Sequence, residues 1–383
     1  MSGKQCYSTQ CHSRGVGEEH QQRPLRVLLD GTPLLGQRSG IGRYTAALLR
    51  ELATRSDVDV MVTAFTARGQ IALRGVVPGG VAVRGGPVPA RALRALWQWV
   101  DWPPTELLAG DADVLHATNF VLPPSKRARG VVTVHDLAFL DRPDFLSRPQ
   151  RDLPDLVQRS AARAAIVCTP SNAVAQQVTR RLRVPAERVV VTPLGVDHSW
   201  FNSVAPTDAL RARLGLPPRY LLFVGAAQPR KGLDVLLEAH RSQPDLAPLV
   251  LAGPAGWGPT LTTSSRVHTV GYLDEAGLRR VVAGATAVVL PSRDEGFGLP
   301  VLEAMAAGIP VVCSDLPALR EVTGGLATLV PPGNPAALAT ALASVDGTAC
   351  DPAGANARRA HAACYSWKSC AQATVRAYRK ARD

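Results

Sequence analysis

The chain has 383 residues, which is enough for two domains with sizeable hydrophobic cores. Its hydrophobic content of 46% includes no apolar run near the ~18 residues of a membrane-spanning helix, and residues 1–24 lack the apolar core of a signal peptide. The formal net charge of +12 suits a phosphorylated ligand, an anionic membrane or nucleic acid, although no zinc-finger or RNP pattern supports the last of these.

The first half of the chain alternates strand-like and helix-like segments. "LRVLLDG" (25–31) predicts a buried strand, and "SGIGRYTAALLRELATR" then predicts a glycine loop that opens an amphipathic helix. Further strands are predicted in "DVMVTAFT", "ADVLHAT", "GVVTVHDL" and "AAIVCTPS". Strands that alternate with helices favour a parallel sheet that is covered by helices on both faces.

The second half repeats this pattern after a proline-rich and turn-rich stretch at 193–218. Its strands are predicted in "RYLLFVG", "APLVLAGP", "RVHTVGYL", "ATAVVLPSR", "GIPVVCSD" and "LATLVPPG". The expected fold class is therefore α/β, with two Rossmann-like domains whose parallel sheets face an interdomain cleft. Ligands bind beyond the carboxyl ends of the strands in such folds, so the glycine loops of both halves are expected to face each other there.

The segment "DEGFGLPVLEAMAAGIPVVCSD" (294–315) places two glutamates around a glycine-rich turn. Glycines allow the backbone to approach a neighbour closely, and the N–H groups at the start of the following helix favour an anion. Glu295 is expected on the loop and Glu303 in the first turn of that helix, where their carboxylates can accept hydrogen bonds from sugar or ribose hydroxyls. The simpler alternative is that Glu303 only complements the helix dipole and Glu295 is solvated.

Five segments resemble, in the correct order, the motifs of family 4 retaining glycosyltransferases, which have the two-domain GT-B fold. They are "SGIGRYTAALLREL", "VTVHDLAF", "VTPLGVD", "VGAAQPRKGLDVLLEA" and "EGFGLPVLEAMAAGIPVV". The resemblance extends from about Leu25 to about Arg379, and "VTVHDL" with "PRKG" and "LAGPAGW" looks most like the subgroup that includes mannosyltransferases. It implies transfer of a hexosyl group, with mannosyl favoured, from a nucleoside-diphosphate sugar to an acceptor hydroxyl to form an α-glycosidic bond.

The resemblance also implies roles for individual residues. Glu303 would bind the donor's ribose hydroxyls and Glu295 the transferred sugar, while His135 would lie near the sugar and the acceptor. Arg230 and Lys231 would bind the diphosphate and stabilise the charge that develops on the leaving group. The implied catalytic residues are His135, Glu295, Arg230 and Lys231. The implied donor-binding residues are Gly40, Gly42, Gly225, Arg230, Lys231, Phe297, Gly298, Leu299 and Glu303.

The sequence departs from the family pattern at the phosphate loop. Ala226 follows Gly225 where many relatives have an arginine, so Arg230 and Lys231 are expected to supply the positive charge between them, with no metal ion or other cofactor. In "REVTGGLAT" Glu321 matches the family, but the usual Gly-Asp pair is missing. Simpler alternatives exist for the site motifs. They are a solvated surface pair for Arg230 and Lys231, a buried hydrogen-bonded residue for His135, and an ordinary strand–helix turn for Gly40 and Gly42.

The same reading predicts the domain organisation. Residues 1–24 are expected to form a disordered extension, 25–197 an N-terminal acceptor domain, 198–217 a linker, 218–355 a C-terminal domain that binds the nucleotide sugar, and 356–383 a helix that crosses back to the N-terminal domain. Trp367 would anchor that last helix.

A tryptophan-rich segment, "RALRALWQWVDWPP" (91–104), places Trp97, Trp99 and Trp102 after Arg91 and Arg94. Aromatic and basic residues together suit a membrane interface or an acceptor groove. The alternative, which is slightly favoured, is a helix that packs its tryptophans into the N-terminal domain.

The cysteine content predicts the cellular compartment, and the glycosyltransferase-like motifs predict the substrates. Seven cysteines without a CxxC pair predict a reduced, cytoplasmic protein, with room for peripheral contact with the inner face of the membrane. The expected partners are GDP-mannose or a UDP-hexose and a saccharide, lipid-linked or small-molecule acceptor, and not nucleic acid.

Two other classes of function compete with this interpretation. A dinucleotide-dependent oxidoreductase would need a complete G-x-G-x-x-G after a strand, which "GIGRYT" does not supply. A non-catalytic sugar-nucleotide or nucleic-acid binding protein would have no need of Glu295 together with Arg230 and Lys231.

Overall fold

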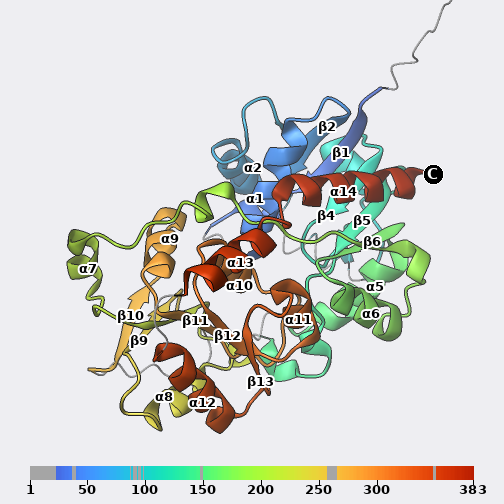
Figure 1. Cartoon of the computed structure of the whole chain (residues 1–383). Helices are drawn as coiled ribbons and strands as arrows, with labels where there is room; N and C mark the ends of the chain where they lie inside the picture. Colours follow the sequence, from blue (N-terminus) through green and yellow to red (C-terminus); the bar gives the residue numbers. More distant parts are fainter. Residues whose placement is uncertain are drawn as a thin grey trace, which may run out of the picture.

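The computed structural model describes residues 23–383, except 37–39, 87, 89–92, 94–95, 98, 147–149, 257–264 and 348–350. Two separate sheets organise these residues into two domains, and the strands pair in parallel throughout both (Figure 1). The prediction of an α/β fold with two Rossmann-like domains is confirmed. The expected N-terminal extension lies almost entirely outside the described residues.

The N-terminal sheet has seven strands in the order β3-β2-β1-β4-β5-β6-β7. Successive side chains of β1 enter different hydrophobic cores, since Val27 and Leu29 pack into one core and Leu28 into another. Both faces of the sheet are therefore buried, which explains the continuous apolar runs in the sequence. The strands are β1 (Leu25–Asp30), β2 (Val58–Thr63), β3 (Ala82–Arg84), β4 (Val114–Ala117), β5 (Arg129–Thr133), β6 (Ile166–Thr169) and β7 (Val189–Val191).

The C-terminal sheet has six strands in the order β10-β9-β8-β11-β12-β13. They are β8 (Leu221–Val224), β9 (Leu249–Ala252), β10 (Val267–Gly271), β11 (Ala287–Leu290), β12 (Val311–Ser314) and β13 (Thr328–Val330). Each sheet reverses its strand order beside its first strand, between β1 and β4 and between β8 and β11. In open parallel sheets a ligand crevice lies beyond the carboxyl ends of the strands at this reversal, so the loops after β8 and β11 are placed to form a site.

Helices connect most of the strands. At the start of several helices, a side chain accepts a hydrogen bond from a backbone N–H group that has no partner within the helix. Ser171 does so at the start of α6 and Asp274 at the start of α9. The helices before the C-terminal pair are α1 (Gly40–Ala53), α2 (Ala67–Arg74), α4 (Thr105–Ala109), α5 (Leu153–Arg163), α6 (Asn172–Arg181), α7 (Asp208–Leu214), α8 (Leu233–Arg241), α9 (Glu275–Ala283), α10 (Leu299–Ala306), α11 (Pro317–Thr323) and α12 (Pro335–Asp346).

The C-terminal segment consists of two helices, α13 (Pro352–Ala362) and α14 (Trp367–Arg382), where the sequence predicts one. α13 packs against α10 of the C-terminal domain, and α14 lies along α1 over the N-terminal sheet (Figure 1). The Tyr378 hydroxyl is buried there and lies 2.7 Å from Nδ1 of His116, while Trp367 packs near Tyr44. In the described part of the chain, no helix has the length and apolar character needed to cross a membrane.

Two strands, β3 and β7, are not among those predicted from the sequence. They are the two edge strands of the N-terminal sheet, and each has only three residues. Their side chains are at most partly buried, but the apolar residues of 81–83 and 189–191 did carry a strand signal, which the prediction overlooked.

Candidate functional site

The loops after β8 and β11 lie side by side at the carboxyl edge of the C-terminal sheet. A backbone hydrogen bond of 2.8 Å from the Arg293 N–H to the Arg230 carbonyl joins them. Nη1 of Arg230 also donates to the carbonyl oxygen of Asp294, at 3.0 Å. The sheet therefore brings the two predicted motifs, residues 225–231 and 294–303, into one cluster.

Glu295 is the centre of this cluster. Its carboxylate accepts hydrogen bonds from Nζ of Lys231 at 2.6 Å, Oγ of Ser292 at 2.8 Å and Nη1 of Arg230 at 3.3 Å. Burial by itself would raise the pKa of Glu295, but Lys231, Arg230 and these hydrogen bonds lower it to about 2, so the carboxylate is ionised at neutral pH. The alternatives of a solvated glutamate and a solvated Arg-Lys surface pair are wrong, because only 7% of the Glu295 side chain and 14% of the Lys231 side chain are exposed.

Glu303 lies in the second turn of α10, which corrects the prediction that it falls in the first turn. The helix begins at Leu299, so Glu303 is too far from its start to complement the dipole, and its side chain is only 2% exposed. It accepts a hydrogen bond from Arg43, on α1 of the other domain. Burial raises the pKa of Glu303, although the Arg43 guanidinium opposes this effect. Glu303 is thus paired with a cation of the other domain.

The turn after β11 touches the N-terminal domain directly. A Cβ atom on Gly296 would lie 1.7 Å from the backbone oxygen of His135, so only glycine fits at this position. Oγ of Ser171 donates a hydrogen bond to the Gly296 carbonyl at 2.8 Å, and Nη1 of Arg230 lies 4.0 Å from the Asp136 carboxylate. The turn that carries Glu295 therefore contacts the loops after β5 and β6 of the N-terminal domain.

His135 follows the carboxyl end of β5 and is buried. Its Nε2 lies 2.8 Å from the carbonyl oxygen of Thr118. Because a carbonyl only accepts, Nε2 carries the proton and Nδ1 has the lone pair. Burial lowers the pKa of His135. The rings of Tyr44 and Phe120 pack against the imidazole ring in T-shaped contacts. His135 is thus a buried neutral histidine, as the alternative supposed, and it also lies against the Glu295 turn.

The remaining predicted residues are distributed around these contacts. Gly298 precedes α10 with φ +97°, and a Cβ there would lie 2.5 Å from Cδ2 of Leu319. Phe297 and Leu299 have buried side chains, so only their backbone atoms are available to a ligand. The other predicted glycines lie on both sides of the site: Gly225 follows β8, while Gly40 begins α1 and Gly42 is buried within it.

Sequence reasoning did not assign Arg43, Ser292 and Asp136 to the site. The place of Arg43 one helical turn after Gly40 is the signal that could have found it. A cation at this distance from a glycine loop points back toward the ligand of that loop. Ser292 and Asp136 flank the recognised residues and had no signal of their own.

Asp294 provides a pH-dependent test of this geometry. Its Oδ1 is buried and makes no hydrogen bond within the described residues, and burial together with Asp136 raises its pKa from 3.8 to about 6. The folded protein therefore binds this proton more tightly than the unfolded chain, so the contribution of Asp294 to stability falls as the pH rises from about 4 to about 6. Because asparagine does not ionise, we expect the free energy of unfolding of Asp294→Asn to rise relative to that of the wild type as the pH increases across that range. Urea denaturation at pH 4, 5, 6 and 7 measures the difference, and a difference independent of pH would contradict the assignment.

Comparisons with known proteins decide the family. Residues 38–200 match the family model "Glycosyltransferase Family 4", and residues 218–345 match "Glycosyl transferases group 1". The chain is 30% identical over 284 residues to the O-antigen chain mannosyltransferase B of Escherichia coli, which covers 70% of this chain and 74% of that protein. The chain belongs to glycosyltransferase family 4.

This family 4 glycosyltransferase is also similar to other members along most of its length. It is 30% identical to a D-inositol 3-phosphate glycosyltransferase of Kineococcus radiotolerans, with 91% of this chain and 92% of that protein covered. The structure of sucrose-phosphate synthase from Thermosynechococcus elongatus superposes with a TM-score of 0.69 at 21% identity, covering 93% of this chain and 98% of that one. These comparisons confirm the GT-B fold and a glycosyltransferase activity, and they do not support the oxidoreductase alternative.

Proposed function

We propose that this enzyme is a retaining hexosyltransferase, with mannosyl the favoured group, that uses GDP-mannose or a UDP-hexose and forms an α-glycosidic bond. The observation that supports it most is the buried Glu295, held ionised between Arg230 and Lys231 at the carboxyl edge of the sheet. Mannose is favoured because the E. coli relative is named as a mannosyltransferase. The acceptor would be a saccharide, a lipid-linked sugar or a small molecule, and the enzyme would act in the cytoplasm, including at the inner face of the membrane.

In this proposal the charged clusters exchange partners when the donor binds. The diphosphate would replace Glu295 as the main partner of Arg230 and Lys231, and ribose hydroxyls would replace Arg43 as the partner of Glu303. Glu295 would then accept hydrogen bonds from hydroxyls of the transferred sugar. An ionised carboxylate suits this role because it has two acceptor oxygens and no donor.

The chemical step would break the bond between the anomeric carbon and the diphosphate oxygen and form a bond from that carbon to the acceptor oxygen, so negative charge develops on the leaving group. Arg230 would bind it through a planar fork and Lys231 as a point charge, aided by the backbone N–H groups of residues 297–299. No metal ion or other cofactor is needed for this. The departing phosphate would receive the acceptor proton, and Nδ1 of the neutral His135 would accept a hydrogen bond from a substrate hydroxyl.

The stereochemical outcome tests the proposed function. We expect a GDP- or UDP-linked α-hexose to give an α-linked product, because the leaving phosphate and the acceptor would use the same face of the sugar. A thermal-shift screen of nucleoside diphosphates selects the donor, and NMR coupling constants then measure the configuration of the new linkage. A β-linked product would rule out the retaining assignment.

Metal independence is a separate prediction. Initial rates should be the same with and without EDTA, because Arg230 and Lys231 would neutralise the leaving group. Arg230→Lys keeps the charge but loses the bidentate fork, so we expect it to lower the rate by roughly tenfold. Complete loss of activity with chelator, restored by Mg²⁺ or Mn²⁺, would contradict the metal-free mechanism. Exposed Arg241 offers the control Arg241→Lys, which should have no effect.

A further inference from the structure

Two adjoining hollows lie on the N-terminal domain, away from the candidate donor site. Leu122 and Arg163 line both of them. Their other lining residues include the C-terminal half of α5 and the start of β5, which is the amino end of the parallel strands. The donor site lies at the carboxyl ends, so these hollows are a separate feature of the fold.

The larger hollow, of about 430 Å³, is mainly apolar. Trp97, Trp99, Val100, Val121, Leu122 and Leu156 contribute its apolar walls. Trp97 is fixed in the fold, because its Nε1 donates to the Pro103 carbonyl at 3.0 Å and its ring packs edge-on against Phe65. For Trp97 the prediction of a packed tryptophan is therefore correct, whereas Arg91 and Arg94 lie outside the described residues.

The segment 96–107, of which Trp97 and Trp99 to Asp101 line this hollow, exposes many apolar side chains. Trp99 is 82% exposed and Trp102 is 58% exposed, so for these two the prediction of packing into the domain is wrong. Of the nine large hydrophobic side chains that are exposed within the described residues, five fall between residues 96 and 107. Single exposed apolar residues are common, but a concentration of this kind marks a surface that contacts another apolar phase.

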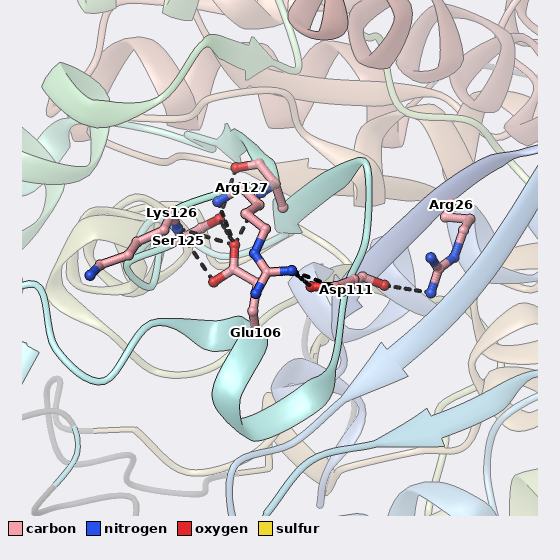
Figure 2. Close-up of polar contacts among 7 residues, drawn as sticks. Arg26, Glu106, Asp111, Ser125, Lys126 and Arg127 are labelled. Carbon is pink, nitrogen blue, oxygen red and sulfur yellow. Dashed lines mark hydrogen bonds and ion pairs between the residues drawn. The ribbon is translucent and has the colours of Figure 1, made fainter.

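The smaller hollow, of about 240 Å³, is basic. Lys126, Arg127 and Arg129 line it, and all three are exposed. Arg127 pairs with Asp111, whereas Lys126 and Arg129 form no ion pair within the described part of the chain. Figure 2 shows the Lys126 side chain directed away from the carboxylate of Glu106.

Glu106 holds this basic loop in place (Figure 2). Its Oε1 accepts hydrogen bonds from Oγ of Ser125 at 2.6 Å and from the backbone N–H groups of Lys126 at 3.1 Å, Arg127 at 2.7 Å and Ala128 at 3.1 Å. Partial burial would raise the pKa of Glu106, but these hydrogen bonds lower it to about 2. The Glu106 carboxylate is therefore engaged with the loop backbone and with Ser125, and it forms no ion pair with the exposed side chains of Lys126 and Arg129.

We propose that this surface docks on an anionic membrane, with Trp99 and Trp102 inserted among the lipid chains at the bilayer interface and Lys126 and Arg129 bound to lipid phosphates. Tryptophan and long basic side chains suit this boundary because each has an apolar body and a polar end. The adjoining apolar and basic hollows match the two parts of a phospholipid. Docking of this kind depends on neither donor nor acceptor, so it goes beyond the proposed transferase activity.

Vesicle binding by the full-length protein tests the proposal without any sugar substrate. The probes are vesicles of phosphatidylcholine alone and vesicles with about one third phosphatidylglycerol. We expect sedimentation with the anionic vesicles only, weakened by 0.5 M NaCl because surface charge attraction is screened. Each cation near an anionic surface contributes about fivefold in affinity, so Lys126→Ala with Arg129→Ala should lower it by roughly 25-fold. Trp99→Ala and Trp102→Ala should each lower it by roughly tenfold.

Matched controls come from α2, whose residues line neither hollow. Ile71, which is 73% exposed, and the exposed Arg74 offer Ile71→Ala and Arg74→Ala, and neither should change vesicle binding. Unchanged melting temperatures would show that all variants are folded. Failure of the wild type to bind anionic vesicles, or binding unaffected by the tryptophan and cation variants, would overturn the proposal. A dimer that Trp99→Ala disrupts, with no binding to vesicles, would assign the surface to a second copy of the chain instead.

Discussion

Replacing Glu295 with alanine is expected to lower the transfer rate by about 100- to 1,000-fold while leaving the affinity for nucleoside diphosphate unchanged or higher. The rate falls because the sugar loses its proposed carboxylate partner. The affinity is maintained because Arg230 and Lys231, which Glu295 neutralises in the ligand-free protein, become available to the phosphates. Initial rates and calorimetry with the bare diphosphate measure the two effects separately.

The same variant should be less stable without ligand. Removing one partner of a buried ion pair leaves an uncompensated charge, which costs about 3–5 kcal/mol, and here two cations are left. Added diphosphate should restore part of this loss, so Glu295→Ala should show a larger ligand-induced rise in melting temperature than the wild type. The exposed Glu238 provides the control Glu238→Ala, which should resemble the wild type in every assay. Strongly reduced diphosphate affinity in Glu295→Ala would reverse the proposed roles.

The second large effect concerns the ion pair between Arg43 and Glu303. Glu303→Ala should weaken nucleoside diphosphate binding by about 10- to 150-fold, which corresponds to ~1.5–3 kcal/mol for hydrogen bonds to a charged group. Arg43→Met should instead destabilise the ligand-free protein by about 3–5 kcal/mol, because it leaves the buried Glu303 without a cation. Since burial already raises the pKa of Glu303, this loss should grow as the pH rises, because the unpaired carboxylate must then ionise in the folded state.

A double-mutant cycle measures the interaction free energy between Arg43 and Glu303 separately from their contacts with other residues. The double variant Arg43→Met with Glu303→Gln should recover most of the stability lost in Arg43→Met, because no buried charge remains. Arg50 lies on the same helix, is 57% exposed and pairs only loosely with Asp197 at 3.6 Å, so Arg50→Met should cost much less. Urea denaturation measures the four stabilities of the cycle. If the losses in free energy of unfolding caused by the Arg43 and Glu303 substitutions were strictly additive, the two side chains would not stabilise each other.

Much of the fold was predictable because its signals are local. All six strands of the C-terminal sheet were expected, since all but β10 contain a short apolar run next to a glycine or proline. The two missed strands, β3 and β7, are three-residue edge strands of the N-terminal sheet. β7 consists of three valines shortly before Pro193, so its signal was present in the sequence and was overlooked. The C-terminal segment was expected as one helix, but it turns between α13 and α14 because the first packs on α10 and the second on α1.

The sequence by itself determined the α/β class, the two repeated halves and the grouping of Glu295 with Arg230 and Lys231, because the topology of parallel sheets brings the ends of neighbouring strands together. Only the tertiary structure decided how the domains meet. Arg43 and Glu303 are 260 positions apart, and no local pattern reports that they pair. The structure also decided that Gly296 rests against His135, and that Trp99 and Trp102 face solvent while Trp97 is packed. Such contacts depend on how the two sheets and their loops pack, which is a property of the whole chain.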